Sequence, residues 1–167
     1  FSDALCSGDM WYTAALGPWI HMFYVSKYYE FVDSWILVFK QYEVSFLQKY
    51  HHAGIVLLMY GGCLSHGNWM VYVVTLNSFI HTLMYTYFAA ATLGYRSPLA
   101  SILTQMQITQ FFIGIIIPCS VLWKDCVSPA SRAFYLGMQT YGVGLVFLFA
   151  QMYTNKYKKS IGEKKTK

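Results

Sequence analysis

The sequence predicts an all-α fold, a polytopic bundle of about five helices that cross a membrane. Hydrophobic residues make up 56% of the 167 positions and charged residues only 11%, whereas a soluble domain carries about 25% charged residues. Acidic and basic residues are absent from 50–95, 97–123 and 133–155. A hydrocarbon core about 30 Å thick requires about 20 helical residues, and each of these segments is long enough. The alternative, a soluble protein with very buried helices, fits this charge distribution poorly.

Five spans account for these segments, and glycines and prolines mark the short connections between them. The spans run over Trp19–Phe39, Phe46–Leu64, Trp69–Leu93, Leu99–Leu122 and Ala133–Tyr153. The first ends before Lys40, the second before Gly67, the third before Gly94 and the fourth before Pro129. Residues 1–155 therefore form a membrane-embedded domain, and residues 156–167 form a basic tail.

Basic residues are concentrated at the C-terminus, where six of the twelve lie after position 155. Because Lys and Arg favour the cytosolic side of a membrane, we expect a cytosolic tail and, with five spans, a luminal N-terminal segment. The last residues, Lys164-Lys165-Thr166-Lys167, match a dilysine signal that returns membrane proteins to the endoplasmic reticulum; a simple solvated tail is the alternative. The rest of the chain is close to neutral, which leaves nucleic-acid binding without support.

The chain begins at Phe1, without an initiator Met or a signal-like segment, and we expect an upstream part to precede it. Cys6 and Cys126 fall in predicted luminal segments, where disulfides are stable, so they are a candidate disulfide pair. Two free thiols are the alternative. Cys63 and Cys119 lie in or near the spans and are predicted to serve packing.

Three charged residues interrupt the first span. Lys27, Glu30 and Asp33 are three positions apart, so on a helix they share one face. Charges inside a membrane face the protein interior or water, and they often mark function. The three are therefore candidate substrate ligands, and a structural ion pair of Lys27 with Glu30 is the alternative.

Gln48, His51 and His52 occupy positions i, i+3 and i+4 at the predicted cytosolic start of the second span. Two further polar stripes lie in uncharged spans. They consist of Asn77, His81 and Tyr85 in the third span, and of Thr104, Gln107 and Gln110 in the fourth. Amides that join helices are the alternative for the fourth span. Together these faces predict a polar chamber, suited to a substrate with a polar head and an apolar tail.

The paired histidines raise the question of a metal. A di-iron desaturase or hydroxylase needs more histidines than the five present. A zinc ion held by His51, His52 and His81 stays open, although no obvious carboxylate orients these ligands. Metal-free chemistry is better supported, with one imidazole as nucleophile and another as general acid or base. A non-catalytic transporter or scaffold with the same polar stripes also stays open.

Four segments, "YVSKYYEFVDSW", "KQYEVSFLQKYHH", "NSFIHTLMYTYF" and "LTQMQITQFF", resemble the ELO family of very-long-chain fatty acid elongases in order and spacing. The resemblance is detailed from Trp19 to Phe112 and looser up to the basic C-terminus. It implies a seven-helix bundle in the endoplasmic reticulum membrane. This chain would hold the last five helices, so that residues 1–155 are an N-terminally incomplete elongase-like domain.

The resemblance also implies an activity. Such enzymes condense a long-chain acyl-CoA with malonyl-CoA to give CO₂, CoA and a 3-ketoacyl-CoA that is two carbons longer, without a metal or other cofactor. The implied partners are acyl-CoA, malonyl-CoA, membrane lipids and the other enzymes of the elongation cycle, namely a ketoacyl reductase, a dehydratase and an enoyl reductase. A homo-oligomer is left open.

Residue roles follow from the same motifs. The resemblance places the family's histidines at His51, His52 and His81. We expect His51 or its neighbour to attack the acyl thioester, His52 to orient or exchange protons, and His81 with Asn77 to stabilise the oxygen that gains charge. The expected substrate-binding residues are Gln48, Lys27, Glu30, Asp33, Asn77, Tyr85, Gln107 and Gln110.

Gln48 departs from the family pattern, in which the box begins with His. Glutamine forms hydrogen bonds but does not titrate, so this position need not carry a proton. The change hints at a preference for polyunsaturated acyl chains. Chain length is expected to be set where bulky side chains close an apolar tunnel, with Trp69, Phe79 and Trp123 as candidates.

Overall fold

The computed structural model describes residues 16–65, 69–95, 99–122 and 129–158, and within these ranges the chain is helical with no strand. The helices are α3 (Leu16–Tyr29), α4 (Phe31–Phe39), α5 (Phe46–Ser65), α6 (Trp69–Thr92), α7 (Ala100–Leu122) and α8 (Pro129–Tyr153), followed by the π-helical turn η1 (Thr154–Lys158). The predicted all-α class is confirmed.

Each predicted span coincides with helix, and the first, over Trp19–Phe39, consists of α3 and α4. The helix divides at Glu30, between α3 and α4. The physical reason is a tightened turn, in which the Asp33 amide donates to the Glu30 carbonyl at 3.2 Å, three residues back instead of four. The regular spacing of charged residues gives no sign of this turn.

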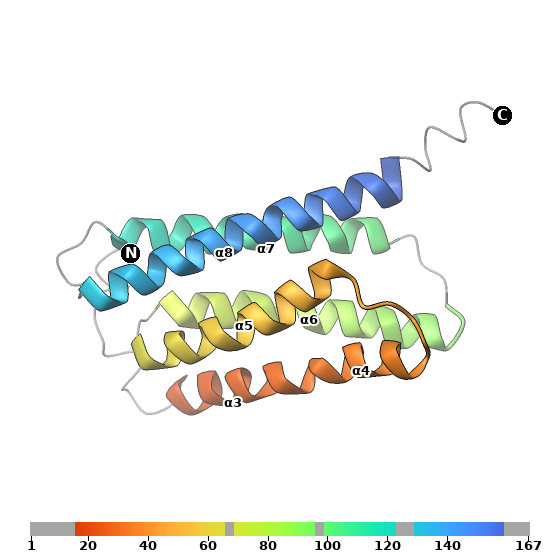
Figure 1. The fold of residues 1–167 in the computed structure, drawn as a ribbon, viewed down its shortest axis with the longest axis horizontal. Coiled ribbons are helices and arrows are strands. Elements are labelled where there is room, and N and C mark those ends of the chain that lie inside the picture. Colours follow the sequence, from red (N-terminus) through yellow and green to blue (C-terminus); the bar gives the residue numbers. More distant parts are fainter. Residues whose placement is uncertain (1–15, 66–68, 96–98, 123–128, 159–167) are drawn as a thin grey trace.

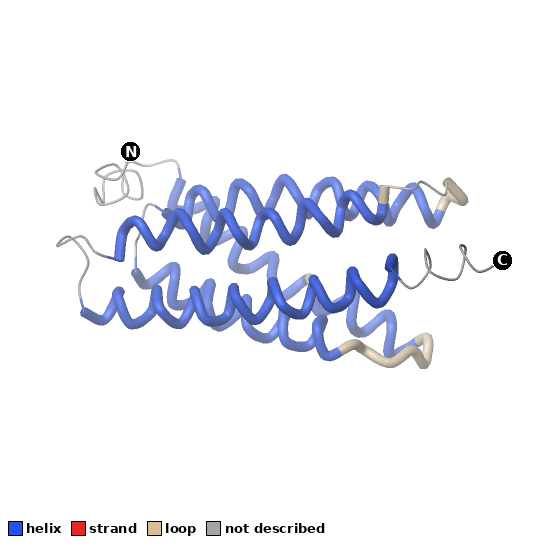
Figure 2. The backbone as a smooth tube through the Cα atoms, turned by 90° about the horizontal axis from the view of Figure 1, so that it is seen from above, coloured by secondary structure: helices blue, strands red, loops and turns tan. Residues whose placement is uncertain are grey.

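The described helices pack in a closed ring. The contacting pairs, in order around it, are α3–α5, α5–α8, α8–α7, α7–α6 and α6–α3. Figures 1 and 2 show the helices running along one common axis, with α3, α4, α6 and α8 in one direction and α5 and α7 in the other. A ring of this kind surrounds an interior, and the polar stripes face it.

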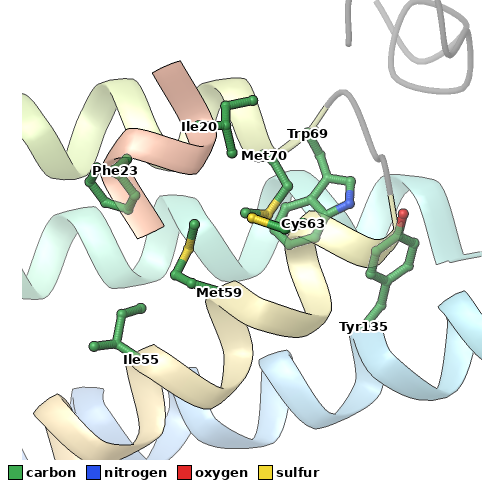
Figure 3. Close-up of a cluster of buried hydrophobic side chains, with 8 residues drawn as sticks. All are labelled: Ile20, Phe23, Ile55, Met59, Cys63, Trp69, Met70 and Tyr135. Atoms are coloured by element: carbon green, nitrogen blue, oxygen red, sulfur yellow. The ribbon is translucent and has the colours of Figure 1, made fainter. Parts of the chain in front are cut away.

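One end of this interior is filled by a hydrophobic core, shown in Figure 3. It lies where α3 and α6 begin and α5 ends, and it consists of Ile20, Phe23, Ile55, Met59, Cys63, Trp69, Met70 and Tyr135. Met59 and Met70 are fully buried and Trp69 is 1% exposed. The predicted packing role of Cys63 is confirmed. Because side chains fill this end, any sizeable cavity must lie toward the other.

Helices α5 and α8 approach closely because glycines on each accept an aromatic ring from the other. A side chain at Gly54 would overlap the ring of Tyr141, and a Cβ at Gly144 would lie 2.6 Å from the hydroxyl of Tyr50. The two tyrosine rings stack with centroids 5.1 Å apart. Small residues commonly allow such close approach between membrane helices, and here it fixes the turn of α5 that carries the paired histidines.

The outer surface of the ring is strongly apolar. Trp19, Phe39, Leu57 and Phe147 are each more than 60% exposed, and soluble monomers rarely expose large apolar patches. Within the described residues, two helices are long and apolar enough to cross a membrane, over Ala100–Ile117 and Arg132–Lys156. This surface suits contact with lipid.

Several predictions fall outside the described residues. They concern the disulfide candidates Cys6 and Cys126, the tunnel candidate Trp123 and the dilysine-like signal Lys164–Lys167. They stay predictions.

Candidate active site

All four polar stripes meet in one chamber inside the helix ring. Its volume is about 520 Å³, within the range of about 300–1,000 Å³ that is usual for small-molecule sites. Among the residues that line it are Glu30, Asp33, Gln48, His51, His52, Asn77, His81, Tyr85, Thr104, Gln107 and Gln110. Sequence spacing therefore selected side chains that the fold brings together.

Three polar contacts join the first span to α6, and we call them the polar ladder: Lys27–Asn77, Glu30–His81 and Asp33–Tyr85. The Lys27 ammonium donates to Asn77 Oδ1 at 2.9 Å. Glu30 Oε1 lies 3.2 Å from His81 Nδ1, and the Tyr85 hydroxyl donates to Asp33 Oδ2 at 2.7 Å. Because the two helices run in the same direction, steps of three and four residues keep the polar ladder in register.

Lys27 and Glu30 form a buried ion pair, with 2.5 Å between Nζ and Oε1. Lys27 is 2% exposed and Glu30 is 8% exposed. The ammonium also lies 4.1 Å from the centre of the Phe23 ring. Removing two charges from water is costly unless the geometry is good and further hydrogen bonds are made, and the ammonium makes one more, to Asn77 Oδ1. Lys27 lies behind Glu30 and is not among the residues that line the chamber.

His51 is at the centre of the histidine cluster. Its ring centroid lies 5.4 Å from that of His52, 6.3 Å from that of His81 and 6.5 Å from that of Phe111. His52 is 8% exposed, and its Nδ1 lies 3.9 Å from Glu30 Oε2. Three imidazoles and one carboxylate therefore share a small buried region.

The remaining predicted ligands are held by individual contacts. Gln48 Nε2 donates to the hydroxyl of Ser34 at 3.0 Å, which ties α5 to α4. Gln107 Nε2 lies 3.4 Å from the sulfur of Met84. Gln110 is 9% exposed and lines both the chamber and the smaller cavity beside it.

The second cavity, of about 80 Å³, is mainly apolar and reaches toward the hydrophobic core. It is lined by Trp69, Val73, Leu76 and Leu145, among others, and it shares His51, Asn77, Gln110 and Phe111 with the chamber. Trp69 therefore lies where a tunnel would close. Phe79 is 55% exposed, so the prediction that it closes the tunnel is wrong: its position on α6 faces outward.

The chamber extends in the opposite direction to one end of the bundle. Ser45 before α5, Ala100 at the start of α7 and Lys156 in η1 line it there. The charge distribution predicts that this end is cytosolic. The polar chamber therefore lies between this end of the bundle and the apolar cavity.

Sequence reasoning missed Tyr141. Its hydroxyl donates to the backbone carbonyl of His51 at 2.8 Å, and its ring lines the apolar cavity. In the sequence it is one aromatic among many, and the nearby Gly142 and Gly144 signal only close helix packing. The partner of Tyr141 depends on which helix packs beside α8. The spacing of residues along α8 does not reveal that this helix is α5.

Metal binding at the histidines deserves a direct geometric test. Ligand atoms of Glu30, His51 and His52 lie within 4.8 Å of one another, so three donors are present. However, the Lys27 ammonium is already 2.5 Å from the Glu30 carboxylate and would repel a cation bound there. The donor set therefore fits a metal poorly.

Comparison with known proteins decides the family, because the family model described as ELO: GNS1/SUR4 matches residues 1–165. The chain belongs to the ELO family. Membership and the apolar helices together indicate a membrane protein.

Curated relatives agree with this assignment. The ELO chain is 35% identical over 150 residues to "Fatty acid elongase sre1" of Dictyostelium discoideum, with 86% of this chain and 54% of the relative covered. It is 32% identical over 158 residues to "Fatty acid elongase 1" of Trypanosoma brucei brucei, with 87% and 51% covered. It is 28% identical over 167 residues to "Fatty acid elongase 2" of Trypanosoma cruzi, with 92% and 60% covered.

The ELO chain thus spans about half the length of the curated relatives that it matches. No solved structure matches it.

Proposed function

We propose that this ELO chain carries the condensing site of a fatty acid elongase, a 3-oxoacyl-CoA synthase that joins an acyl-CoA to malonyl-CoA. One observation carries the proposal: His51 lines both the polar chamber and the apolar cavity. A thioester with an apolar tail on one side and a large polar group on the other fits this junction. The names of the relatives support fatty acid elongation in general.

The reaction divides into two half-reactions. In the first, a ring nitrogen of His51 attacks the acyl carbon; the C–N bond forms, the C–S bond breaks, and the proton lost by the ring goes to the CoA thiolate. In the second, malonyl-CoA loses CO₂ and its C2 carbanion attacks the same carbon. A C–C bond forms, the C–N bond breaks, and the departing imidazolate takes up a proton from the solvent. The product is a 3-ketoacyl-CoA.

Asn77 is suited to stabilise the oxygen that gains charge. Its Oδ1 accepts from Lys27 at 2.9 Å, so its amide nitrogen is left with its two N–H donors for the chamber. Donors fixed before the reaction stabilise an oxyanion most effectively. The buried amide of Gln110 lines the same junction and offers a second donor.

The proposal is tested with the complete chain in membranes, using malonyl-CoA labelled at C2 and a long-chain acyl-CoA. Wild type should transfer label to a product two carbons longer, and His51→Ala should not. Incorporation that is unchanged in His51→Ala would contradict the assignment of the site. A transporter or scaffold would give no label transfer in wild type.

Metal-free chemistry is part of this proposal. Elemental analysis of the purified complete chain separates it from the di-iron alternative. Stoichiometric iron that tracks with activity would contradict the elongase assignment and favour a desaturase or hydroxylase.

Substrate preference is proposed to depend on Gln48. Its amide donates to Ser34 at the wall of the chamber, and a histidine there could take up a proton where glutamine cannot. We expect wild type to favour polyunsaturated acyl chains. Gln48→His should shift the products when a panel of acyl-CoAs is assayed, and an unchanged preference would count against this role.

The proposed setting is the endoplasmic reticulum membrane, with the basic tail in the cytosol. The 3-ketoacyl-CoA product requires a ketoacyl reductase, a dehydratase and an enoyl reductase to complete a cycle. Protease accessibility of a tag after Lys167 tests the orientation, and replacement of Lys164 and Lys165 by Ser tests retrieval.

A further inference from the structure

The carboxylate of Glu30 faces the Nδ1 atoms of two histidines, His81 and His52. Its Oε1 lies 3.2 Å from His81 Nδ1, and its Oε2 lies 3.9 Å from His52 Nδ1. Among the described residues, Glu30 Oε2 and both Nδ1 atoms are buried without a hydrogen-bond partner. Only the distance between Glu30 and His81 is short enough for a hydrogen bond. Catalytic hydrogen bonds are often poorly aligned before substrate binds and tighten afterwards.

Lys27 fixes this carboxylate in place. The ammonium donates to Glu30 Oε1 at 2.5 Å and to Asn77 Oδ1 at 2.9 Å, so it is anchored to both sides of the helix interface. It balances the charge of the carboxylate, which as an ion can only accept hydrogen bonds. A group that only accepts requires its neighbour to donate, and the nearest ring nitrogen is His81 Nδ1.

The hydrogen bond at one ring nitrogen determines the chemistry of the other. If Nδ1 of a neutral histidine carries the proton, Nε2 has a free lone pair and acts as a base. A buried carboxylate imposes this state on the histidine of a serine protease triad. His81 lines the chamber, and its ring stacks against that of His51 with centroids 6.3 Å apart. Its unprotonated Nε2 is therefore available to the reaction proposed at His51.

We propose that Glu30, held by Lys27, is a positioning residue that keeps the proton of His81 on Nδ1 and makes Nε2 the proton acceptor of the chamber. This inference rests on the proposed condensing function and revises the role that the sequence predicts for His81. His81 then acts as a general base and not as the donor that stabilises an oxyanion, which leaves that role to Asn77.

The assignment closes the proton balance of the first half-reaction. As the acyl-imidazole forms, His51 loses a proton, which His81 Nε2 accepts. The resulting imidazolium of His81 is stabilised by Glu30, and it returns the proton to the thiolate as CoA leaves. In this assignment Glu30 acts through His81, and Lys27 acts through Glu30 and Asn77.

The first test locates the proton directly. The complete chain is labelled with ¹⁵N-histidine, and His81→Gln identifies the signals of His81. A one-bond N–H coupling at Nδ1 of His81 is expected in wild type at neutral pH. A coupling at Nε2 would overturn the inference. Because this readout needs no turnover, it stays informative even if the proposed condensation fails.

The second test measures rates for Glu30→Gln and Glu30→Asp. General acid–base catalysis contributes about 10²–10⁴-fold, so Glu30→Gln should lower kcat at least about 10²-fold and leave KM for acyl-CoA unchanged. Glu30→Asp, which keeps the carboxylate, should recover part of the rate. A kcat that is unchanged in Glu30→Gln would overturn the inference while leaving the elongase assignment intact.

A third variant covers the case in which Glu30→Gln does not fold. Replacing both charges in Lys27→Met/Glu30→Leu removes the ion pair without leaving an unpaired charge, a change that is often tolerated. If Glu30 positions His81, the double variant should fold, but its His81 should no longer carry the proton preferentially on Nδ1, and its kcat should stay low. If the ion pair is merely structural, kcat returns to the wild-type value. Tyr28→Phe, an exposed position on α3, is the matched control that should change neither readout.

Discussion

Removing one hydroxyl group tests how α8 positions the turn of α5 that carries His51. Tyr141→Phe removes the 2.8 Å hydrogen bond from the Tyr141 hydroxyl to the His51 carbonyl. The stacked ring of Tyr50, 5.1 Å away, and the glycine that accepts Tyr141, Gly54, hold the aromatic ring in place. The variant therefore changes the position of His51 without changing how α5 and α8 pack.

The size of the effect follows from the kind of bond. Hydrogen bonds between membrane helices average about 0.6 kcal/mol, and typical intramolecular bonds contribute up to about 1.5 kcal/mol. If this free energy is used to align the ring of His51 in the transition state, kcat falls about threefold to tenfold. If the hydrogen bond is equally strong in the ground state and in the transition state, the stability of the fold falls and kcat does not change.

The assay compares kcat, KM and the melting temperature of Tyr141→Phe with those of wild type. We expect a lower kcat, an unchanged KM for acyl-CoA and a small loss of stability. Tyr28→Phe, which removes the exposed bond between the Tyr24 and Tyr28 hydroxyls, is the control and should leave kcat unchanged. A Tyr141→Phe variant with wild-type kcat and reduced stability would refute the positioning argument.

Three further predictions concern other parts of the chamber. Trp69→Ala should allow longer products, measured by chromatography of the acyl chains, and should cost about 3–5 kcal/mol of stability because the side chain is fully buried; unchanged product length would place the closed end elsewhere. Gly54→Val should destabilise the fold by about 1–3 kcal/mol through overlap with Tyr141, and a wild-type melting temperature would contradict the packing. Dialysis against a chelator should leave elongation unchanged, whereas loss of activity that zinc or iron restores would revive a metal site at Glu30, His51 and His52.

Sequence spacing was sufficient to find the chamber. A polar group that faces lipid is costly, and helical spacing fixes which side chains share a face. For this reason Gln48, His51 and His52 could be expected on one wall, and the stripes of the other spans on the remaining walls. The chamber-lining residues confirm this convergence.

The spacing of residues in the sequence could not predict which polar stripes contact one another. The polar ladder depends on α3 and α6 being neighbours that run in the same direction, and this order is set by packing over the whole ring. The same holds for Tyr141, whose partner lies on α5, and for Phe79, whose outward orientation depends on the rotation of α6. The turn at Glu30 also has no signal in the local sequence, because neither Gly nor Pro occurs there.

The most direct test of the central claim is the mass of the complete chain after exposure to a long-chain acyl-CoA without malonyl-CoA. We predict an adduct equal to one acyl group, mapped by peptide sequencing to His51, that disappears when malonyl-CoA is added. The control His51→Ala should show no adduct. An unmodified wild-type chain, under conditions in which it completes turnovers once malonyl-CoA is present, would contradict the acyl-imidazole at His51.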